Sequence, residues 1–144
     1  PNPISFAVCS YDPDAFFSAV RGMESFPEGG ARCAVCYRLR LTEAAKAAKD
    51  GGFDYFTPTL SISPMKDAEK LNAIGAELAK QYGVAYLFSD FKKREGYKRS
   101  ITLSQEYGLY RQNYCGCIFS RAEAEKRISR QQETINTAQA NLKL

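Results

Sequence analysis

The amino-acid sequence predicts an α/β fold with a mostly parallel sheet flanked by helices. Three short apolar segments with the composition of strands, residues 4–9, 53–60 and 84–88, alternate with longer segments of helical periodicity. This alternation is typical of parallel sheets, because a parallel pair of strands needs a long crossover connection. Three strands are fewer than the roughly five of an average sheet. We therefore expect the chain to lack its first βα unit.

Start and stop signals bound the helices of the first half. Asp12 is a favourable N-cap and Pro13 a favourable first helical residue, so we expect a helix from there to about Gly22. A second helix is predicted over residues 33–49, where apolar residues recur at helical spacing and two glycines follow. After this helix, residues 53–60 are predicted to form a strand that leads into a loop.

The second half follows the same alternation. Ser63 and Pro64 open a segment whose predicted helix runs to Tyr82, and Gly83 ends it. After the strand at residues 84–88, another helix is predicted over residues 97–107. The phenylalanines at periodic apolar positions are expected in the core: Phe16, Phe53 and Phe88.

The bulk properties indicate one ordinary globular domain. The chain has 144 residues, of which 44% are hydrophobic and 25% charged. We expect residues 1–130 to form a single α/β domain and residues 131–144 to form a flexible tail. No segment has the ~20 apolar residues of a membrane span or the pattern of a secretory signal, so we expect a cytoplasmic protein with no membrane partner. A net charge of +4 permits a nucleic-acid partner without requiring one.

Five cysteines and no histidine restrict the chemistry of this chain. Cys33 and Cys36 form a C-x-x-C pair at a predicted helix start, where residues three apart share a face and the helix terminus favours thiolates. Cys115 and Cys117 form a C-x-C pair around Gly116, which permits the tight turn that this spacing needs. Two close pairs far apart in sequence usually converge, so we predict that these four cysteines meet at one centre.

Three interpretations of the four thiols stay open from the residues alone. Cysteine thiolates hold iron–sulfur clusters, and four of them in a tetrahedron hold structural zinc. The third interpretation is a redox pair in which Cys33 and Cys36 form a disulfide bond. Cys9 lies alone in an apolar segment and is expected to be buried and inert.

A basic and aromatic segment precedes the C-x-C pair. Residues 91–99 carry five positive charges and two aromatic rings, and Tyr107, Tyr110, Arg111 and Tyr114 follow. Proteins that bind RNA use cations for phosphates and flat side chains for unstacked bases. The alternative is an ordinary solvated loop and helix face. The predicted RNA-binding residues are Lys92, Lys93, Arg94, Lys98, Arg99 and Arg111.

Four stretches stand out in the sequence: RCAVCYRLRL at residues 32–41, GFDYFTPTLSISP at 52–64, SDF at 89–91 and LYRQNYCGCIFS at 109–120. Together they resemble the QueH family of epoxyqueuosine reductases. The resemblance covers residues 11–120 in order, and the two stretches that contain cysteines are its most specific part.

This resemblance implies a Rossmann-like fold and the reduction of epoxyqueuosine to queuosine at the wobble position of tRNAs with GUN anticodons. It also implies a [4Fe–4S] cluster on Cys33, Cys36, Cys115 and Cys117, and it leaves open a second, single iron near the cluster. The electron donor is unknown. Opening an epoxide also needs a proton, and the candidate catalytic residues are Asp12, Tyr37 and Tyr110. The rival function is a non-catalytic RNA-binding module with a structural zinc ion on the same four cysteines.

Two features depart from the family pattern. Family members usually begin with a strand that ends in a His-x-Cys-Cys motif, which has no counterpart here. In addition, Thr57-Pro58-Thr59 stands where the family tends to have three threonines, and Pro58 removes a backbone donor. Because the chain starts with Pro1 directly before a predicted strand, we interpret it as a fragment. We expect such a fragment to assemble its metal centre incompletely and to be poorly soluble or dimeric.

Overall fold

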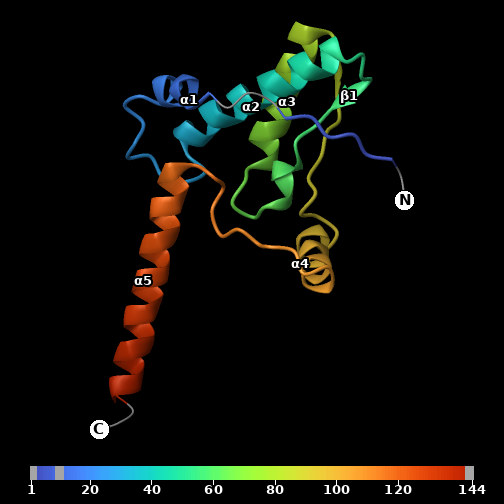
Figure 1. Cartoon of the computed structure of the whole chain (residues 1–144). Coiled ribbons are helices and arrows are strands. Elements are labelled where there is room, and N and C mark those ends of the chain that lie inside the picture. The colour runs from blue at the N-terminus through green and yellow to red at the C-terminus, as the bar shows by residue number, and fades with distance from the viewer. Residues whose placement is uncertain (1–2, 9–11, 142–144) are drawn as a thin grey trace.

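The computed structural model describes residues 3–8 and 12–141 (Figure 1). Along the chain it contains α1 (Pro13–Ala19), α2 (Ala31–Asp50), β1 (Tyr55–Phe56), the 3-10 helix η1 (Thr59–Ile62), α3 (Ala68–Tyr82), β2 (Ala85–Tyr86), α4 (Gly96–Glu106) and α5 (Ile118–Asn141). The strands β1 and β2 pair in parallel, with Tyr55 opposite Ala85 and Phe56 opposite Tyr86. The fold is therefore α/β, mostly helical, with a small two-stranded sheet.

The core lies between the sheet and helices α2 and α3. The buried apolar residues of α2 recur every three or four positions and form one face, which packs on a similar face of α3 that includes Leu71, Ile74 and Leu78. Phe56 and Tyr86 cover this core from the sheet. Gly75 allows α3 to approach β2, because a Cβ atom there would lie 2.2 Å from the ring of Tyr86.

The strands differ most from the sequence-based prediction. Residues 4–8 of the first predicted strand form no regular element and are exposed, and Cys9 lies outside the described residues. The other two predicted strands shrink to two residues each. A strand is stabilised by pairing with neighbours, and β1 and β2 have only each other among the described residues. Phe53 and Phe88, predicted to be core residues, are 64% and 66% exposed.

The helices agree with the prediction within a few residues. The predicted N-cap Asp12 accepts a hydrogen bond from the Ala15 N–H at 3.0 Å, and Pro13 is the first residue of α1. The last helix, α5, runs from Ile118 to Asn141 and points away from the other elements (Figure 1). The domain boundary at residue 130 and the mobility of residues 131–144 stay predictions. None of the helices within the described ranges has the length and apolar character of a membrane span.

Candidate functional site

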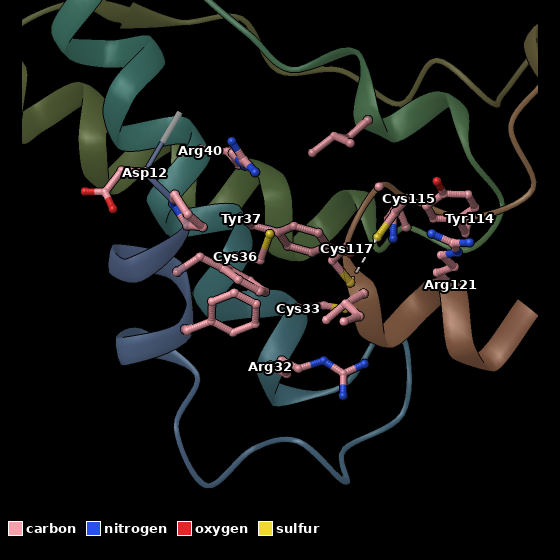
Figure 2. Close-up of a pocket in the computed structure, with 17 residues that line it drawn as sticks. Asp12, Arg32, Cys33, Cys36, Tyr37, Arg40, Tyr114, Cys115, Cys117 and Arg121 are labelled. Atoms are coloured by element: carbon pink, nitrogen blue, oxygen red, sulfur yellow. Dashed lines mark hydrogen bonds between the residues drawn. The ribbon is translucent and has the colours of Figure 1, made fainter. Parts of the chain in front are cut away.

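The two cysteine pairs meet at one cavity of about 440 Å³ (Figure 2). Cys33 and Cys36 lie in the first two turns of α2, and Cys115 and Cys117 lie in the turn before α5. All four cysteines line the cavity. The structure thus brings together the four predicted metal-binding residues from segments far apart in the chain, and their thiols are free.

The C-x-x-C pair is held at the N-terminal end of α2. Cys33 is buried, and its sulfur accepts a hydrogen bond from the Gly29 N–H at 3.2 Å. Cys36 lies one turn later and is half-buried. Burial raises the pKa of the Cys36 thiol, because a thiolate is poorly solvated there.

The C-x-C pair is formed by a tight turn. Gly116 adopts a φ of 95°, which favours glycine, and the sulfur atoms of Cys115 and Cys117 lie 3.6 Å apart. Burial opposes ionisation of Cys117, but hydrogen bonds from the Ser120 side chain and backbone outweigh it and lower the pKa of this thiol. A lowered thiol pKa favours the thiolate that metals bind.

The chemistry of this cavity suits a soft metal, although the thiols are not closed around one point. Thiolates are the ligands preferred by zinc and by iron–sulfur clusters. Within residues 3–8 and 12–141, no three cysteine or acidic side chains come close enough together to hold one ion. The donor types therefore fit a metal group, and both pairs line the same cavity.

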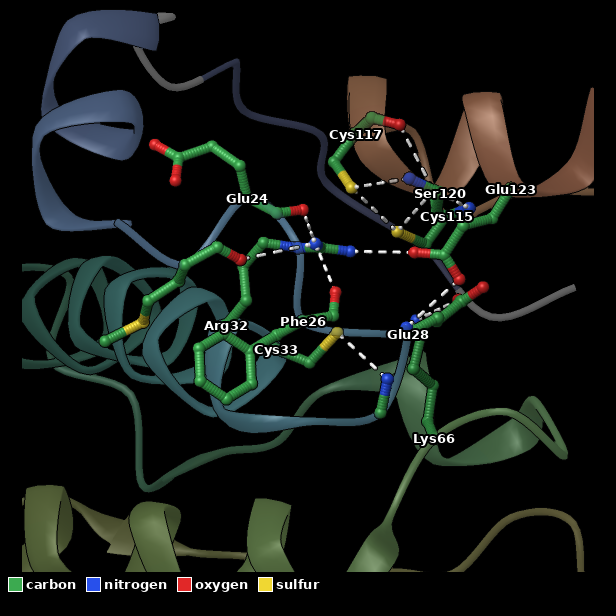
Figure 3. Close-up of polar contacts among 12 residues, drawn as sticks. Glu24, Phe26, Glu28, Arg32, Cys33, Lys66, Cys115, Cys117, Ser120 and Glu123 are labelled. Carbon is green, nitrogen blue, oxygen red and sulfur yellow. Dashed lines mark hydrogen bonds and ion pairs between the residues drawn. The ribbon is translucent and has the colours of Figure 1, made fainter. Parts of the chain in front are cut away.

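Two charged side chains that the sequence did not single out line the same cavity as the thiols. Lys66 lines the cavity and forms a buried ion pair with Glu28 at 2.7 Å, their side chains being 4% and 6% exposed. Arg32 also lines the cavity and pairs with Glu123 at 3.0 Å (Figure 3). The only sequence feature that pointed to Arg32 was its position next to Cys33 in the first of the family-like stretches. No sequence feature pointed to Lys66, because its ion-pair partner Glu28 lies 38 residues away.

Two of the three candidate catalytic residues lie at the cavity. Asp12 and Tyr37 line it, whereas Tyr110 does not. Tyr37 is 3% exposed, and its hydroxyl has no hydrogen-bond partner among the described residues. Burial raises the pKa of Tyr37 to about 12, so the hydroxyl keeps its proton at neutral pH. Tyr110 is 83% exposed in the irregular segment that leads to the C-x-C pair.

The predicted RNA-binding residues lie around the start of α4 and just after its end. Lys93 and Lys98 are 77% and 80% exposed, and Arg94, Arg99 and Arg111 are exposed as well. Lys92 differs from them. Its ammonium group pairs with Asp90 at 3.1 Å and donates to the Lys66 carbonyl, so it supports the cavity wall.

Comparison with known proteins places these features in a family. Residues 2–123 match the family model described as epoxyqueuosine reductase QueH. The chain is 45% identical over 119 residues to the epoxyqueuosine reductase QueH of Streptococcus pyogenes serotype M1, covering 83% of this chain and 47% of that protein. It is 38% identical over 118 residues to the QueH of Thermotoga maritima, covering 80% of this chain and 62% of the relative.

A relative from Staphylococcus epidermidis is 41% identical over 119 residues, which are 81% of this chain and 50% of that protein. The chain thus spans about half the length of the curated relatives that it matches. The match includes both cysteine pairs and the segments that bring them to one cavity. This chain belongs to the epoxyqueuosine reductase QueH family.

Proposed function

We propose that the protein is an epoxyqueuosine reductase that reduces epoxyqueuosine to queuosine at the wobble position of tRNAs with GUN anticodons. Membership of the family supports this reaction, and the relatives carry the same name. The observation that carries the proposal is that two distant cysteine pairs line one cavity beside Asp12 and Tyr37. Since the chain spans about half of its relatives, the activity of the whole protein is proposed for it rather than established.

The proposal includes a [4Fe–4S] cluster bound by the four thiols and leaves open a second, single iron. When bound, such a cluster supplies the two electrons of the reduction one at a time, from a donor of unknown identity. Lys66 and Arg32 also line the cavity, each paired with a carboxylate, Glu28 and Glu123 respectively. Tyr37, which keeps its proton at neutral pH, is a candidate proton donor to the epoxide oxygen, and the candidate Asp12 lines the same cavity.

The proposed substrate contact is the surface around α4. Exposed cations at residues 93–99 would contact phosphates of the tRNA, and the exposed ring of Tyr110 offers a face for an unstacked base. Tyr110 is five residues before Cys115, so this surface is continuous along the chain with the cavity. We also propose a Rossmann-like arrangement and a cytoplasmic location for the protein.

Anaerobic reconstitution with iron and sulfide tests the cluster. We expect a brown protein with a broad absorption band and reduced iron content in the Ala variants of Cys33, Cys36, Cys115 or Cys117. Cys9→Ala is the matched control and should keep its iron. Full iron and colour in all four variants would show that the metal assignment is wrong. Reduction of epoxyqueuosine in tRNA, followed by mass spectrometry of nucleosides, tests the reaction itself.

One distance favours the second candidate function, an RNA-binding module with a structural zinc ion. Two thiolates at ~2.3 Å from one tetrahedral ion lie about 3.8 Å apart. The Cys115 and Cys117 sulfurs, at 3.6 Å, have nearly this spacing. A colourless protein that retains zinc and binds tRNA without reducing epoxyqueuosine would support this function. Activity that survives chelation of metals would instead support a thiol–disulfide pair.

A further inference from the structure

Four basic side chains line the cysteine cavity, and two of them lie at its exposed rim. Arg32 and Lys66 are buried in ion pairs, whereas Arg40 and Arg121 are exposed. Among the described residues that line the cavity the only acid is Asp12, whose carboxylate caps α1. We propose that Arg40 and Arg121 form a phosphate clamp, which holds the RNA backbone on either side of the nucleotide whose base enters the cavity. This inference rests on the proposed function in taking RNA as the ligand.

Arg40 has a guanidinium that no carboxylate engages. It lies four residues after Cys36 on α2, so the two side chains share the face of the helix that lines the cavity. Among the described residues, no carboxylate lies within ion-pair distance of this guanidinium. Arg38, on the same helix, pairs with Glu77 at 2.5 Å and does not line the cavity. A guanidinium binds phosphate through two parallel hydrogen bonds, so Arg40 can take a phosphate without breaking an existing ion pair.

Arg121 is the second arm of the clamp. It lies near the start of α5, four residues after Cys117. Its guanidinium pairs with Glu125 at 2.9 Å, and the two side chains are 64% and 62% exposed. Such an exposed pair contributes little to stability, so exchanging the carboxylate for a phosphate costs little. In Figure 2 the labelled cysteines lie between Arg40 and Arg121. An RNA strand held by both arginines would therefore pass over the thiols.

Apolar and aromatic side chains of the same cavity suit the base of a nucleotide. Phe17 and Ile118 line the cavity and are 47% and 61% exposed, and the half-buried ring of Tyr114 lines it as well. Unstacked bases pack on flat and apolar side chains, whereas cations hold the phosphates. The volume of about 440 Å³ lies within the range of roughly 300 to 1,000 Å³ of small-ligand sites. The cavity therefore fits one nucleotide of an RNA strand, with its base inside and its phosphates at the rim.

The test measures binding of an anticodon stem-loop RNA with a GUN anticodon to the 144-residue chain by fluorescence anisotropy. Arg40→Gln should weaken binding about tenfold, the effect of losing one charged hydrogen-bonded contact, and should flatten the salt dependence by a slope of about 0.7. Arg121→Gln should change binding in the same direction. Arg38→Gln is the matched control, because Arg38 is an exposed arginine on the same helix outside the cavity. It should bind the RNA like the unchanged protein.

Neutral linkages in the RNA identify the phosphates that the clamp holds. A methylphosphonate, with a 2′-O-methyl group for chemical stability, replaces in turn each of the two phosphates that flank the wobble nucleotide. Either replacement should weaken binding to the unchanged protein. One of the two should cause no further loss in Arg40→Gln, and the other should cause none in Arg121→Gln. A methylphosphonate in the stem should have the same effect on every variant as on the unchanged protein.

Three results would each overturn the clamp. They are unchanged binding in Arg40→Gln, equal weakening in Arg40→Gln and Arg38→Gln, and losses from protein and RNA changes that simply add at both flanking phosphates. The assay uses neither iron nor epoxyqueuosine. RNA that couples to both arginines in a protein that does not reduce epoxyqueuosine would therefore support the clamp and count against the proposed function alone. Reduction of epoxyqueuosine without such coupling would do the reverse.

Discussion

Arg32 is the side chain that joins the two cysteine-bearing segments. It is 2% exposed, its guanidinium donates to the carbonyls of Glu24 and Phe26, and it pairs with Glu123 at 3.0 Å. The same group lies 4.5 Å from the centre of the Phe119 ring. Since Arg32 immediately precedes Cys33 and both partners from the second segment lie on α5, this side chain ties the start of α2 to the start of α5.

Replacing Arg32 by Met should therefore destabilise the protein by about 3 kcal/mol, because buried carbonyls lose their donor. Urea unfolding followed by circular dichroism measures this loss. Arg121→Met is the control, since Arg121 makes an exposed pair with Glu125 at 2.9 Å, and it should leave the unfolding midpoint unchanged. Equal midpoints for Arg32→Met and the unchanged protein would contradict the tethering role.

At the scale of elements, Asp67 determines where α3 begins. Its carboxylate accepts hydrogen bonds from the N–H groups of Glu69 and Lys70, at 3.0 and 3.1 Å. These bonds lower the pKa of Asp67 from its ordinary value of 3.8. A lowered pKa in the folded state adds stability above the unfolded pKa, and this stability is lost as the pH falls through the folded value.

Asp67→Ala should destabilise the protein by about 1 kcal/mol at pH 7, the usual effect of losing an N-cap. Asp67→Asn keeps an acceptor and should be milder. The free energy of unfolding of the Asn variant should also fall less steeply between pH 5 and roughly pH 3 than that of the unchanged protein. Identical pH profiles for the two proteins would mean that the ionised form of Asp67 contributes nothing to stability.

The turn before α4 presents the basic residues in a defined conformation. Arg94 and Glu95 have positive φ angles of 49° and 61°, and a Cβ atom on Gly96 would lie 1.8 Å from the Phe91 carbonyl oxygen. Such a turn needs glycine at position 96. It leaves Lys93 and Lys98 exposed, so these two are better probes of RNA contact than Lys92, which supports the cavity wall.

Changing Lys93 and Lys98 to Glu should weaken tRNA binding and reduce its dependence on salt, by a slope of about 0.7 to 0.9 for each lost phosphate contact. Filter binding across a salt series measures both quantities. The charge control is the pair Lys49→Glu and Lys80→Glu, which lie exposed on α2 and α3. If both double variants behave alike, only the net charge matters and the surface around α4 has no special role.

At the scale of the molecule, the small sheet has an apolar outer face. Phe56 and Tyr86 point towards the helices, and the alternation of side chains places Tyr55 and Leu87 on the opposite face, 62% and 49% exposed. Exposed apolar surface of this kind favours association. We therefore predict that this face contributes to self-association, while the solubility and the oligomeric state stay predictions.

The double change Tyr55→Lys and Leu87→Lys should reduce self-association without loss of stability, since neither side chain is buried in the core. Light scattering at increasing concentration measures the association, and urea unfolding checks the stability. A buried position such as Leu41, which is 1% exposed, would not serve for this test, because a lysine there would destabilise the core. Scattering that is unaffected by the change would place the associating surface elsewhere.

The sequence alone was enough to predict the main helices and several residues of the candidate site. A helix forms from hydrogen bonds between residues four apart, so caps, glycines and apolar spacing were enough to predict α2 and α3. The four cysteines could be recognised because the members of each pair are only two or three positions apart in the sequence. Asp12 and Tyr37 were also among the residues chosen from the sequence, and both line the cavity.

Only the tertiary structure decided the lengths of the strands and the partners of the charged residues. A strand depends on neighbours that no local pattern supplies, and the predicted strands were accordingly too long. Arg32 and Glu123 are 91 residues apart, and Lys66 and Glu28 are 38 apart. Ser120 lies close to the cysteines in sequence, yet its hydrogen bonds to Cys115 and Cys117 depend on a turn geometry that spacing alone does not specify. Packing places these groups together, and pairing lowers the free-energy cost of burying a charge.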